Sequence, residues 1–167
     1  CSSDLDSINR NLLWPILLKN GVKGKLFKCV KSMYNNVKAR VKHGNTLSDV
    51  INCTAGVKQG DVCSPVLFSL FINELAVKVI RNGRHGATFS AEPFELFLLL
   101  LADDVVLMSE TVVELQNQLS SLHNAAVALD LCVNLHKSNI IVFRKGGYLS
   151  CRERWFYDRA LMPIVNV

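Results

Sequence analysis

The sequence predicts a domain of the α+β class in which an antiparallel sheet packs on helices. Apolar residues recur at helical spacing in four segments, and elsewhere they alternate with polar residues or form short runs rich in strand formers. The strand-like segments occur in pairs joined by turn residues, which is typical of antiparallel hairpins. Half of the 167 residues are apolar, so the chain has enough hydrophobic material for a sizeable core.

Two helices are predicted at the N-terminal end. Residues 8–19 have apolar side chains on one side of a helix, although Pro15 should kink or interrupt it because proline lacks a backbone donor. Gly21 is a typical helix terminator. Residues 23–34 repeat apolar side chains at helical spacing and should form the second helix.

A basic hairpin should follow these helices. From Val37 the sequence alternates between apolar and basic residues, which is the pattern of a strand with two different faces. Residues 43–45 have turn chemistry, and residues 50–54 can return as the second strand. One face of this hairpin is therefore a candidate nucleic-acid-binding surface, made by Lys38, Arg40 and Lys42.

A loop and a long helix are predicted next. Residues 56–61 form the loop, and Ser64 followed by Pro65 is a typical helix start, with serine as the N-cap and proline in the first helical position. Residues 65–80 are apolar on nearly all sides, so this helix should be central and buried. Residues 82–86 should form another loop.

The remaining chain should contain short strands and one more helix. Thr111 and Glu114 form a capping box that opens a helix reaching about Leu129. The last 20 residues are basic and aromatic and show no clear period. Short strands are predicted at residues 94–101, 105–108, 131–133 and 139–143.

Charge and cysteine usage limit the class of protein. A net charge of +5 and a pI near 9.0 suit a polyanionic partner, although the basic groups in residues 19–42, 81–85 and 144–159 have solvated surfaces as an alternative explanation. The six cysteines show no C-x-x-C pair, so neither a structural zinc nor disulfides are expected. No apolar run approaches the ~20 residues that cross a bilayer, and the sequence shows no secretory signal. We therefore expect an intracellular protein, cytoplasmic or nuclear, without membrane contact.

Two adjacent carboxylates, Asp103 and Asp104, lie between the apolar runs 94–101 and 105–108. Carboxylates so close to a core need a compensating cation. Their hard oxygen atoms suit Mg²⁺, which keeps water molecules and substrate phosphates in its other positions. Two such ions can activate an attacking hydroxyl and stabilise a leaving pyrophosphate. An ordinary Asp-Asp hairpin turn is the alternative, which the two residues by themselves favour; their sequence context reverses that preference.

Three segments together resemble the motifs of reverse transcriptases. Residues 97–108 are similar to the (Tyr/Phe)-x-Asp-Asp motif between hydrophobic strands. Upstream, Gly-Val-Lys-Gln-Gly-Asp-Val-Cys-Ser-Pro-Val-Leu-Phe at 56–68 and Phe-Ile-Asn-Glu-Leu at 71–75 are similar to the motif that precedes it. Downstream, Asn-Leu-His-Lys-Ser at 134–138 is similar to the lysine-bearing motif that follows. Their order and spacing, with Phe-Arg-Lys-Gly-Gly at 143–147, point to the enzymes of non-LTR (LINE-like) retrotransposons.

This resemblance implies an RNA-directed DNA polymerase. The fold would be a polymerase palm with part of the fingers, with helices and the basic hairpin of palm and fingers in about 1–63, the palm in about 64–167, and no thumb. The reaction would use an RNA template, a DNA primer, deoxynucleoside triphosphates and two Mg²⁺ ions, for which Mn²⁺ can substitute. The rest of a retroelement polyprotein, with the thumb and an endonuclease domain, would be the protein partner. An RNA-templated RNA polymerase is disfavoured, because such enzymes usually have Gly-Asp-Asp and the Gln59-Gly60 segment argues against them.

The resemblance also implies a role for individual residues. Asp103 and Asp104 match the catalytic, metal-binding pair, and Lys137 matches a lysine near the triphosphate that neutralises charge or donates a proton. Gln59 and Gly60 match the segment beside the incoming nucleotide, where an amide can hydrogen-bond and a glycine permits close backbone approach. A capping amide is the alternative for Gln59, and an exposed lysine at a strand end is the alternative for Lys137.

Two departures from the family pattern bear on activity. Leu101 stands where the family has an aromatic residue that supports the nucleotide or primer end, so the stacking face and the hydroxyl are missing. The segment 6–10 (Asp-Ser-Ile-Asn-Arg) matches the end of the first palm motif, which places its metal-bridging aspartate one residue before Cys1. Both ends of the chain look like cuts through structured sequence. We therefore expect a fragment that is inactive alone, and a non-catalytic, nucleic-acid-binding remnant of a retroelement is the alternative function.

Overall fold

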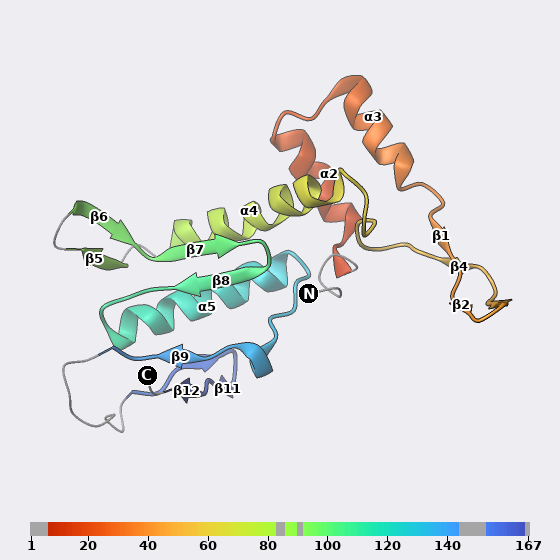
Figure 1. Ribbon diagram of the computed structural model, residues 1–167. Coiled ribbons are helices and arrows are strands. Elements are labelled where there is room, and N and C mark those ends of the chain that lie inside the picture. The colour runs from red at the N-terminus through yellow and green to blue at the C-terminus, as the bar shows by residue number, and fades with distance from the viewer. Residues whose placement is uncertain (1–6, 83–85, 90–91, 144–152, 166–167) are drawn as a thin grey trace. The chain divides into compact units, whose positions relative to one another are not determined.

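The computed structural model describes residues 7–82, 86–89, 92–143 and 153–165, and it has the predicted mixed α+β composition (Figure 1). The chain divides into two compact units, 1–74 and 75–167, which we call unit 1 and unit 2. All four predicted α-helices are present, and the described residues also include a short 3₁₀-helix. They are α2 (Arg10–Lys19), α3 (Gly24–Met33), α4 (Ser64–Asn82), α5 (Val112–Ala128) and the 3₁₀-helix η1 (Leu135–Lys137).

The described strands pair two by two, so the single antiparallel sheet that the sequence predicted is not formed within the described residues. Five ladders are antiparallel: β1 (Lys38–Ala39) with β4 (Ile51–Asn52), β2 (Lys42–His43) with β3 (Thr46–Leu47), β5 (Ala87–Phe89) with β6 (Glu92–Leu96), β7 (Leu98–Leu101) with β8 (Asp104–Leu107), and β10 (Phe156–Tyr157) with β11 (Ala160–Leu161). The sixth ladder, β9 (Ile140–Ile141) with β12 (Ile164–Val165), is parallel. The prediction of a strand at residues 131–133 was wrong.

Helix α2 supplies the core of unit 1. The side chains of Leu13 and Leu17 are fully buried, and the side chain of Asn9 caps the helix by accepting a hydrogen bond from the backbone of Asn11. We expected Pro15 to kink or interrupt the helix. It causes no interruption, because α2 continues unbroken to Lys19. The proline removes one backbone hydrogen-bond donor from the helix, at an exposed position.

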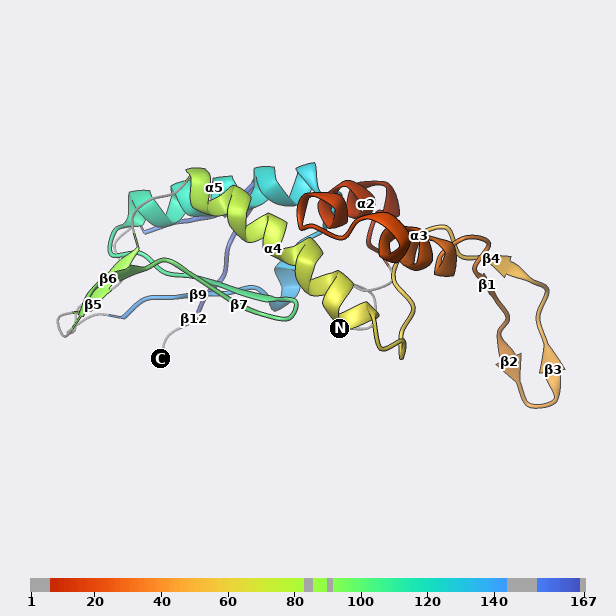
Figure 2. The same cartoon turned by 90° about the horizontal axis from the view of Figure 1, so that it is seen from above.

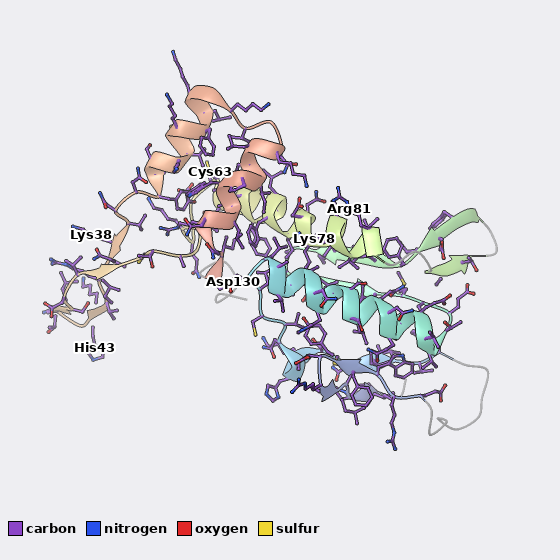
Figure 3. All side chains as sticks on the ribbon, turned by 180° about the vertical axis from the view of Figure 1, so that it is seen from behind. Lys38, His43, Cys63, Lys78, Arg81 and Asp130 are labelled. Atoms are coloured by element: carbon purple, nitrogen blue, oxygen red, sulfur yellow. The ribbon has the colours of Figure 1, made fainter. Side chains whose placement is uncertain are left out.

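The predicted basic hairpin is confirmed, but it is less regular and more exposed than the alternating pattern suggested. Its strands break at residues 40 and 41, which leaves two short ladders. Apolar residues of the hairpin face solvent too, with Val41 62% and Leu47, on the opposite strand, 54% exposed. Figure 3 shows His43 at the tip of the hairpin, directed away from the rest of unit 1.

Helix α4 begins one residue earlier than predicted and is buried along one stripe rather than on all sides. Ser64 is its first residue, and the Ser64 hydroxyl donates to the Lys58 carbonyl at 2.5 Å instead of capping the helix. Val66 is 61% exposed, so the prediction of burial all round was wrong. The buried stripe follows helical spacing and comprises Leu67, Phe68, Phe71, Leu75 and Val79.

Helix α5 organises unit 2, and Figures 1 and 2 show it running alongside the β7–β8 ladder. The predicted cap is confirmed, since the Thr111 side chain accepts a hydrogen bond from the backbone of Glu114. The amide of Gln118 donates to the Met108 carbonyl, and the indole of Trp155 donates to a carbonyl in the first turn of the helix. Among the described helices, none combines the length and apolarity needed to span a membrane.

Candidate active site

The paired aspartates lie at the end of the β7–β8 hairpin, as the sequence predicted. The two strands are in register from Leu98 opposite Leu107 to Leu101 opposite Asp104, so the connection has only two residues, Ala102 and Asp103. Asp104 is therefore the first residue of β8, and Asp103 is the last residue of the turn. This arrangement holds the two carboxylate-bearing residues on a rigid element rather than on a long loop.

The turn stores backbone strain next to the carboxylates. Ala102 has a φ of 53°, a left-handed conformation that residues with a Cβ adopt at a cost of roughly 1–2 kcal/mol. Two-residue hairpin turns require a positive φ at their first position, and glycine or asparagine usually occupies it. Strained residues of this kind cluster at functional sites, where the surrounding structure holds them in place.

One face of the hairpin is more exposed than the other, and Asp104 lies on this exposed face. Cross-strand partners share a face, so Asp104 lies beside Leu101, which is 78% exposed. Leu99 and its partner Val106 continue this face at 47% and 49% exposure. The candidate carboxylate therefore lies at the end of an open apolar strip, where a flat organic group could make contact.

The carboxylate oxygens of Asp103 and Asp104 are the type of ligand that a hard divalent cation prefers. Asp103 is half-buried and Asp104 is exposed, and within the described residues neither carboxylate has a hydrogen-bond or ion-pair partner. No group of three or more potential ligand side chains is gathered anywhere in the described part of the chain. Proteins nevertheless often bind Mg²⁺ through two carboxylates, with water and substrate phosphates as its other ligands.

Lys137 is exposed at the end of η1 in the same unit. The turn is fixed by hydrogen bonds from the backbone of Lys137 to the Asn134 carbonyl and from the Ser138 hydroxyl to the same carbonyl, at 3.1 and 2.9 Å. The alternative explanation, an exposed lysine at a strand end, is wrong as to the element, since the residue is in a 3₁₀-helix. In both views η1 lies at the end of unit 2 where the β7–β8 turn lies (Figures 1 and 2).

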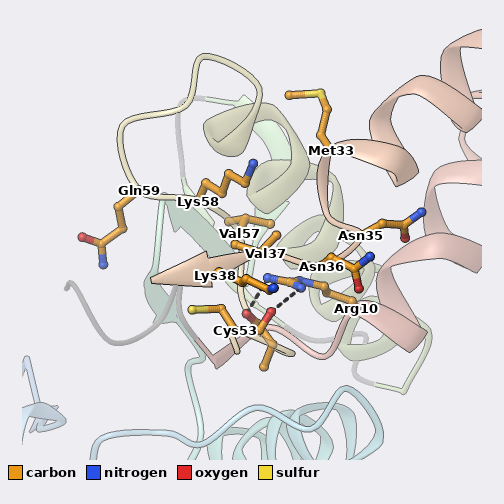
Figure 4. Close-up of a pocket in the computed structure, with 11 residues that line it drawn as sticks. Arg10, Met33, Asn35, Asn36, Val37, Lys38, Cys53, Val57, Lys58 and Gln59 are labelled. Atoms are coloured by element: carbon orange, nitrogen blue, oxygen red, sulfur yellow. Dashed lines mark hydrogen bonds between the residues drawn. The ribbon is translucent and has the colours of Figure 1, made fainter. Parts of the chain in front are cut away.

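Gln59 and Gly60 belong to the loop of unit 1 that precedes α4. Gly60 has a φ of 79°, which favours glycine, and a Cβ at this position would meet nothing within 4 Å. The loop is fixed by the Asp61 carboxylate, which accepts a hydrogen bond from the backbone of Cys63 at 2.9 Å. The Gln59 side chain is exposed and points outward in Figure 4.

Sequence inspection missed the buried charge of unit 1. Arg10 is only 9% exposed, and its guanidinium donates to the carbonyls of Gly56, Cys53 and Ala55 at 2.7, 2.8 and 2.8 Å and to that of Tyr34 at 3.3 Å. Its position three and seven residues before the buried leucines of α2 was a signal for burial. This side chain joins the start of α2, the end of α3 and the loop that leads to Gln59.

Comparison with known proteins agrees with the motifs. Residues 5–153 match the family model described as reverse transcriptase (RNA-dependent DNA polymerase). The chain is 32% identical over 114 residues to a retrovirus-related Pol polyprotein from type-1 retrotransposable element R2 of Popillia japonica, a match covering 66% of the chain and 16% of that protein. It is 29% identical over 117 residues to the R2 polyprotein of Nasonia vitripennis, with 70% and 11% covered.

A third relative comes from a different mobile element. The chain is 27% identical over 152 residues to the RNA-directed DNA polymerase from mobile element jockey of Drosophila funebris, a match covering 86% of the chain and 16% of that protein. The chain thus spans less than a fifth of the length of these relatives. The family match covers most of the chain, and the relatives come from the mobile elements R2 and jockey. The chain belongs to the reverse transcriptase family.

Proposed function

We propose that this chain supplies the polymerase palm and part of the fingers of a reverse transcriptase that extends a DNA primer on an RNA template. The observation that carries the proposal is the Asp103–Asp104 pair at the strained end of the β7–β8 hairpin, in a chain of this family. Both carboxylates are free of competing partners within the described residues, so their oxygen atoms are available to a cation.

The proposal divides the chain by role. Residues 1–63 supply helices and the basic hairpin of palm and fingers, and residues 64–167 supply the palm. The rest of a retroelement polyprotein supplies the thumb and an endonuclease domain. Synthesis takes place in the cytoplasm or the nucleus, where RNA and deoxynucleoside triphosphates are present.

In the reaction, the primer 3′-hydroxyl loses its proton to water, its oxygen forms a bond to the α-phosphorus of the nucleotide, and the bond from that phosphorus to pyrophosphate breaks. Asp103 and Asp104 would hold the metal ions through their carboxylate oxygens. When bound, Mg²⁺ lowers the pKa of the attacking hydroxyl and neutralises charge on the leaving pyrophosphate. Lys137 donates a proton to that pyrophosphate or balances its charge.

The remaining site residues position the substrates. Gln59 donates from its amide to the incoming nucleotide, and Gly60 lets the backbone approach it closely. Leu101 offers an exposed apolar contact on the same face as Asp104. On the exposed hairpin of unit 1, the cationic side chains that contact template or primer phosphates are Lys38, Arg40 and Lys42.

A non-catalytic, nucleic-acid-binding protein is the second candidate. Leu101 favours it, because this residue lacks the ring with which an aromatic side chain stacks on a base or sugar. Binding through the basic hairpin does not require the carboxylates. The two functions therefore separate in an experiment that measures binding and synthesis on the same protein.

Primer extension on poly-A with an oligo-dT primer, dTTP and Mg²⁺ or Mn²⁺ tests the proposal. We expect no synthesis by the 167-residue chain alone, because it spans less than a fifth of the length of the relatives it matches. A version extended on both sides with flanking coding sequence should extend the primer. Asp103→Asn should abolish this synthesis, whereas the control Asp158→Asn, an exposed aspartate at another positive-φ turn, should retain it.

The outcomes distinguish the two candidates. Full activity of Asp103→Asn in the extended version would refute the metal assignment. Nucleic-acid binding without synthesis by the extended wild-type protein would establish the non-catalytic function instead.

A further inference from the structure

The net positive charge of the protein comes from unit 1. This unit contains ten Lys and Arg residues against five Asp and Glu residues, whereas unit 2 contains nine of each. The excess of five charges in unit 1 equals the net charge of the whole chain. Residues 7–48 contain no acidic residue at all. An anionic ligand is therefore expected on unit 1, beyond what the exposed hairpin alone indicates.

A pocket of about 650 Å³ lies within this unit, between the end of α3 and the loop before α4 (Figure 4). Eleven residues line it, of which three are cationic and none is acidic. Asn35 and Asn36 add amide groups that can donate hydrogen bonds. The cationic residues are Arg10, Lys38 and Lys58.

Two of these cations share one aromatic ring. The guanidinium of Arg10 lies 5.1 Å from the centre of the Tyr34 ring, and the ammonium of Lys58 lies 5.8 Å from it. The ring is held in place by Trp14, whose centroid is 5.9 Å away. Within the described residues, neither cation forms an ion pair with a carboxylate.

Both cations lie around the same ring without a carboxylate partner within the described residues, and an anion in the pocket would balance their charge. Figure 4 draws the bonds from Arg10 to Cys53 and Ala55 as dashed lines. The donors of Arg10 are taken by four carbonyls, so this residue contributes charge and shapes the pocket wall. Direct hydrogen bonds to a bound anion would come from the exposed lysines and the amides.

We propose that this pocket binds a backbone phosphate of a nucleic-acid strand. The choice of a strand rests on the proposed function, in which the protein acts on template and primer. Lys38 links the pocket to the basic hairpin, because it lines the pocket and is also the first residue of β1. A strand that follows the hairpin would thus be fixed at one phosphate, while the remaining contacts stay diffuse.

The test compares two double variants that remove the same charge from the 167-residue chain. The pocket variant is Lys38→Gln/Lys58→Gln. The matched control is Lys23→Gln/Lys25→Gln, two exposed lysines at the start of α3, about 12–15 Å of helix away from the pocket-lining Met33. That separation exceeds the Debye length of ~8 Å at physiological salt.

Binding of a fluorescent single-stranded oligonucleotide is measured by anisotropy as a function of salt. We expect the pocket variant to bind at least about tenfold more weakly than wild type, and the slope of log K against log salt to fall by about 0.7, for one lost phosphate contact. The control should lose less than about threefold. Equal losses in both variants, or wild-type binding by the pocket variant, would overturn the proposal.

Further arms identify the source of the anion. Asn36 has a φ of 56°, so Asn36→Gly keeps the backbone while removing the amide, and it should weaken binding several-fold with an unchanged circular dichroism spectrum. Inorganic phosphate, dTTP and polyglutamate are added as competitors. Competition by dTTP alone, or by polyglutamate as strongly as by unlabelled oligonucleotide, would overturn the assignment to a nucleic-acid strand.

The failure of this proposal differs from the failure of the proposed function. Asp103→Asn should retain wild-type binding in the same assay, because its effect is on synthesis. If primer extension fails while the pocket variant binds poorly, the pocket assignment stands and the polymerase assignment does not. The reverse pattern would keep the polymerase and remove the pocket.

Discussion

Replacing Arg10 by methionine should destabilise unit 1 severely. Methionine keeps most of the side-chain volume but removes the donors that now satisfy four carbonyls. Two of these hydrogen bonds are buried, those to Gly56 and Tyr34, and the other two are partly buried. A buried acceptor left without a partner costs about 1–3 kcal/mol. Losing the two buried bonds therefore costs about 2–6 kcal/mol, which is comparable with the whole stability of a small domain.

Urea denaturation followed by circular dichroism measures this loss, with Arg40→Met as the control. Arg40 is exposed on the basic hairpin, so its replacement should change the unfolding free energy by less than about 0.5 kcal/mol. Hydrogen exchange should locate the effect, because the amides of Cys53 and Gly56 donate to backbone carbonyls in the segments that Arg10 joins. A loss below about 1 kcal/mol in Arg10→Met would refute the idea that this residue fastens the unit.

Three further predictions concern unit 2. Thr111→Ala should destabilise the chain by about 1 kcal/mol, seen as a lower Tm, because the side chain that caps α5 is lost, whereas Thr111→Ser should not. Burial, helped by the nearby charges of Cys132 and Asp158, raises the pKa of Tyr157 to about 12. The folded state therefore holds this proton more tightly than the unfolded state. The unfolding free energy should be insensitive to this group below pH 10 and should fall as the pH rises from 10 towards 12. Tyr157→Phe should flatten that fall in denaturation measured across this pH range. In an active extended version, Lys137→Ala should lower kcat by about 10²–10⁴ if the lysine donates a proton, and a fully restored rate in Lys137→Arg would show that charge alone suffices.

Local sequence patterns predicted the elements near the candidate site well. The capping pair at Thr111 and Glu114 and the two apolar runs around the aspartates act over a few residues, and the structure has a helix and a hairpin where they indicate them. The start of the second strand differs by one residue, since Asp104 begins β8 and the turn contains only Ala102 and Asp103. The positive φ of Ala102 could not be predicted, because alanine carries no preference for that conformation.

Features that depend on distant partners were missed. The parallel pairing of β9 and β12 joins segments more than 20 residues apart, and no local period indicates it. The burial of Arg10 depends on carbonyls that lie 24 to 46 residues away in the sequence. The apolar sides of α4 predicted complete burial, but its exposed Val66 shows that composition does not fix which face finds a partner.

The most direct test of the central claim is a Mn²⁺ titration of the 167-residue chain followed by NMR. Mn²⁺ substitutes for Mg²⁺ at carboxylate sites, and its paramagnetism broadens the signals of nearby amides. If Asp103 and Asp104 hold the cation, broadening should begin at residues 101–105 at the lowest Mn²⁺ concentrations and disappear in Asp103→Asn/Asp104→Asn. Broadening that starts at other carboxylates, or that persists at the β7–β8 turn in the double variant, would contradict the account.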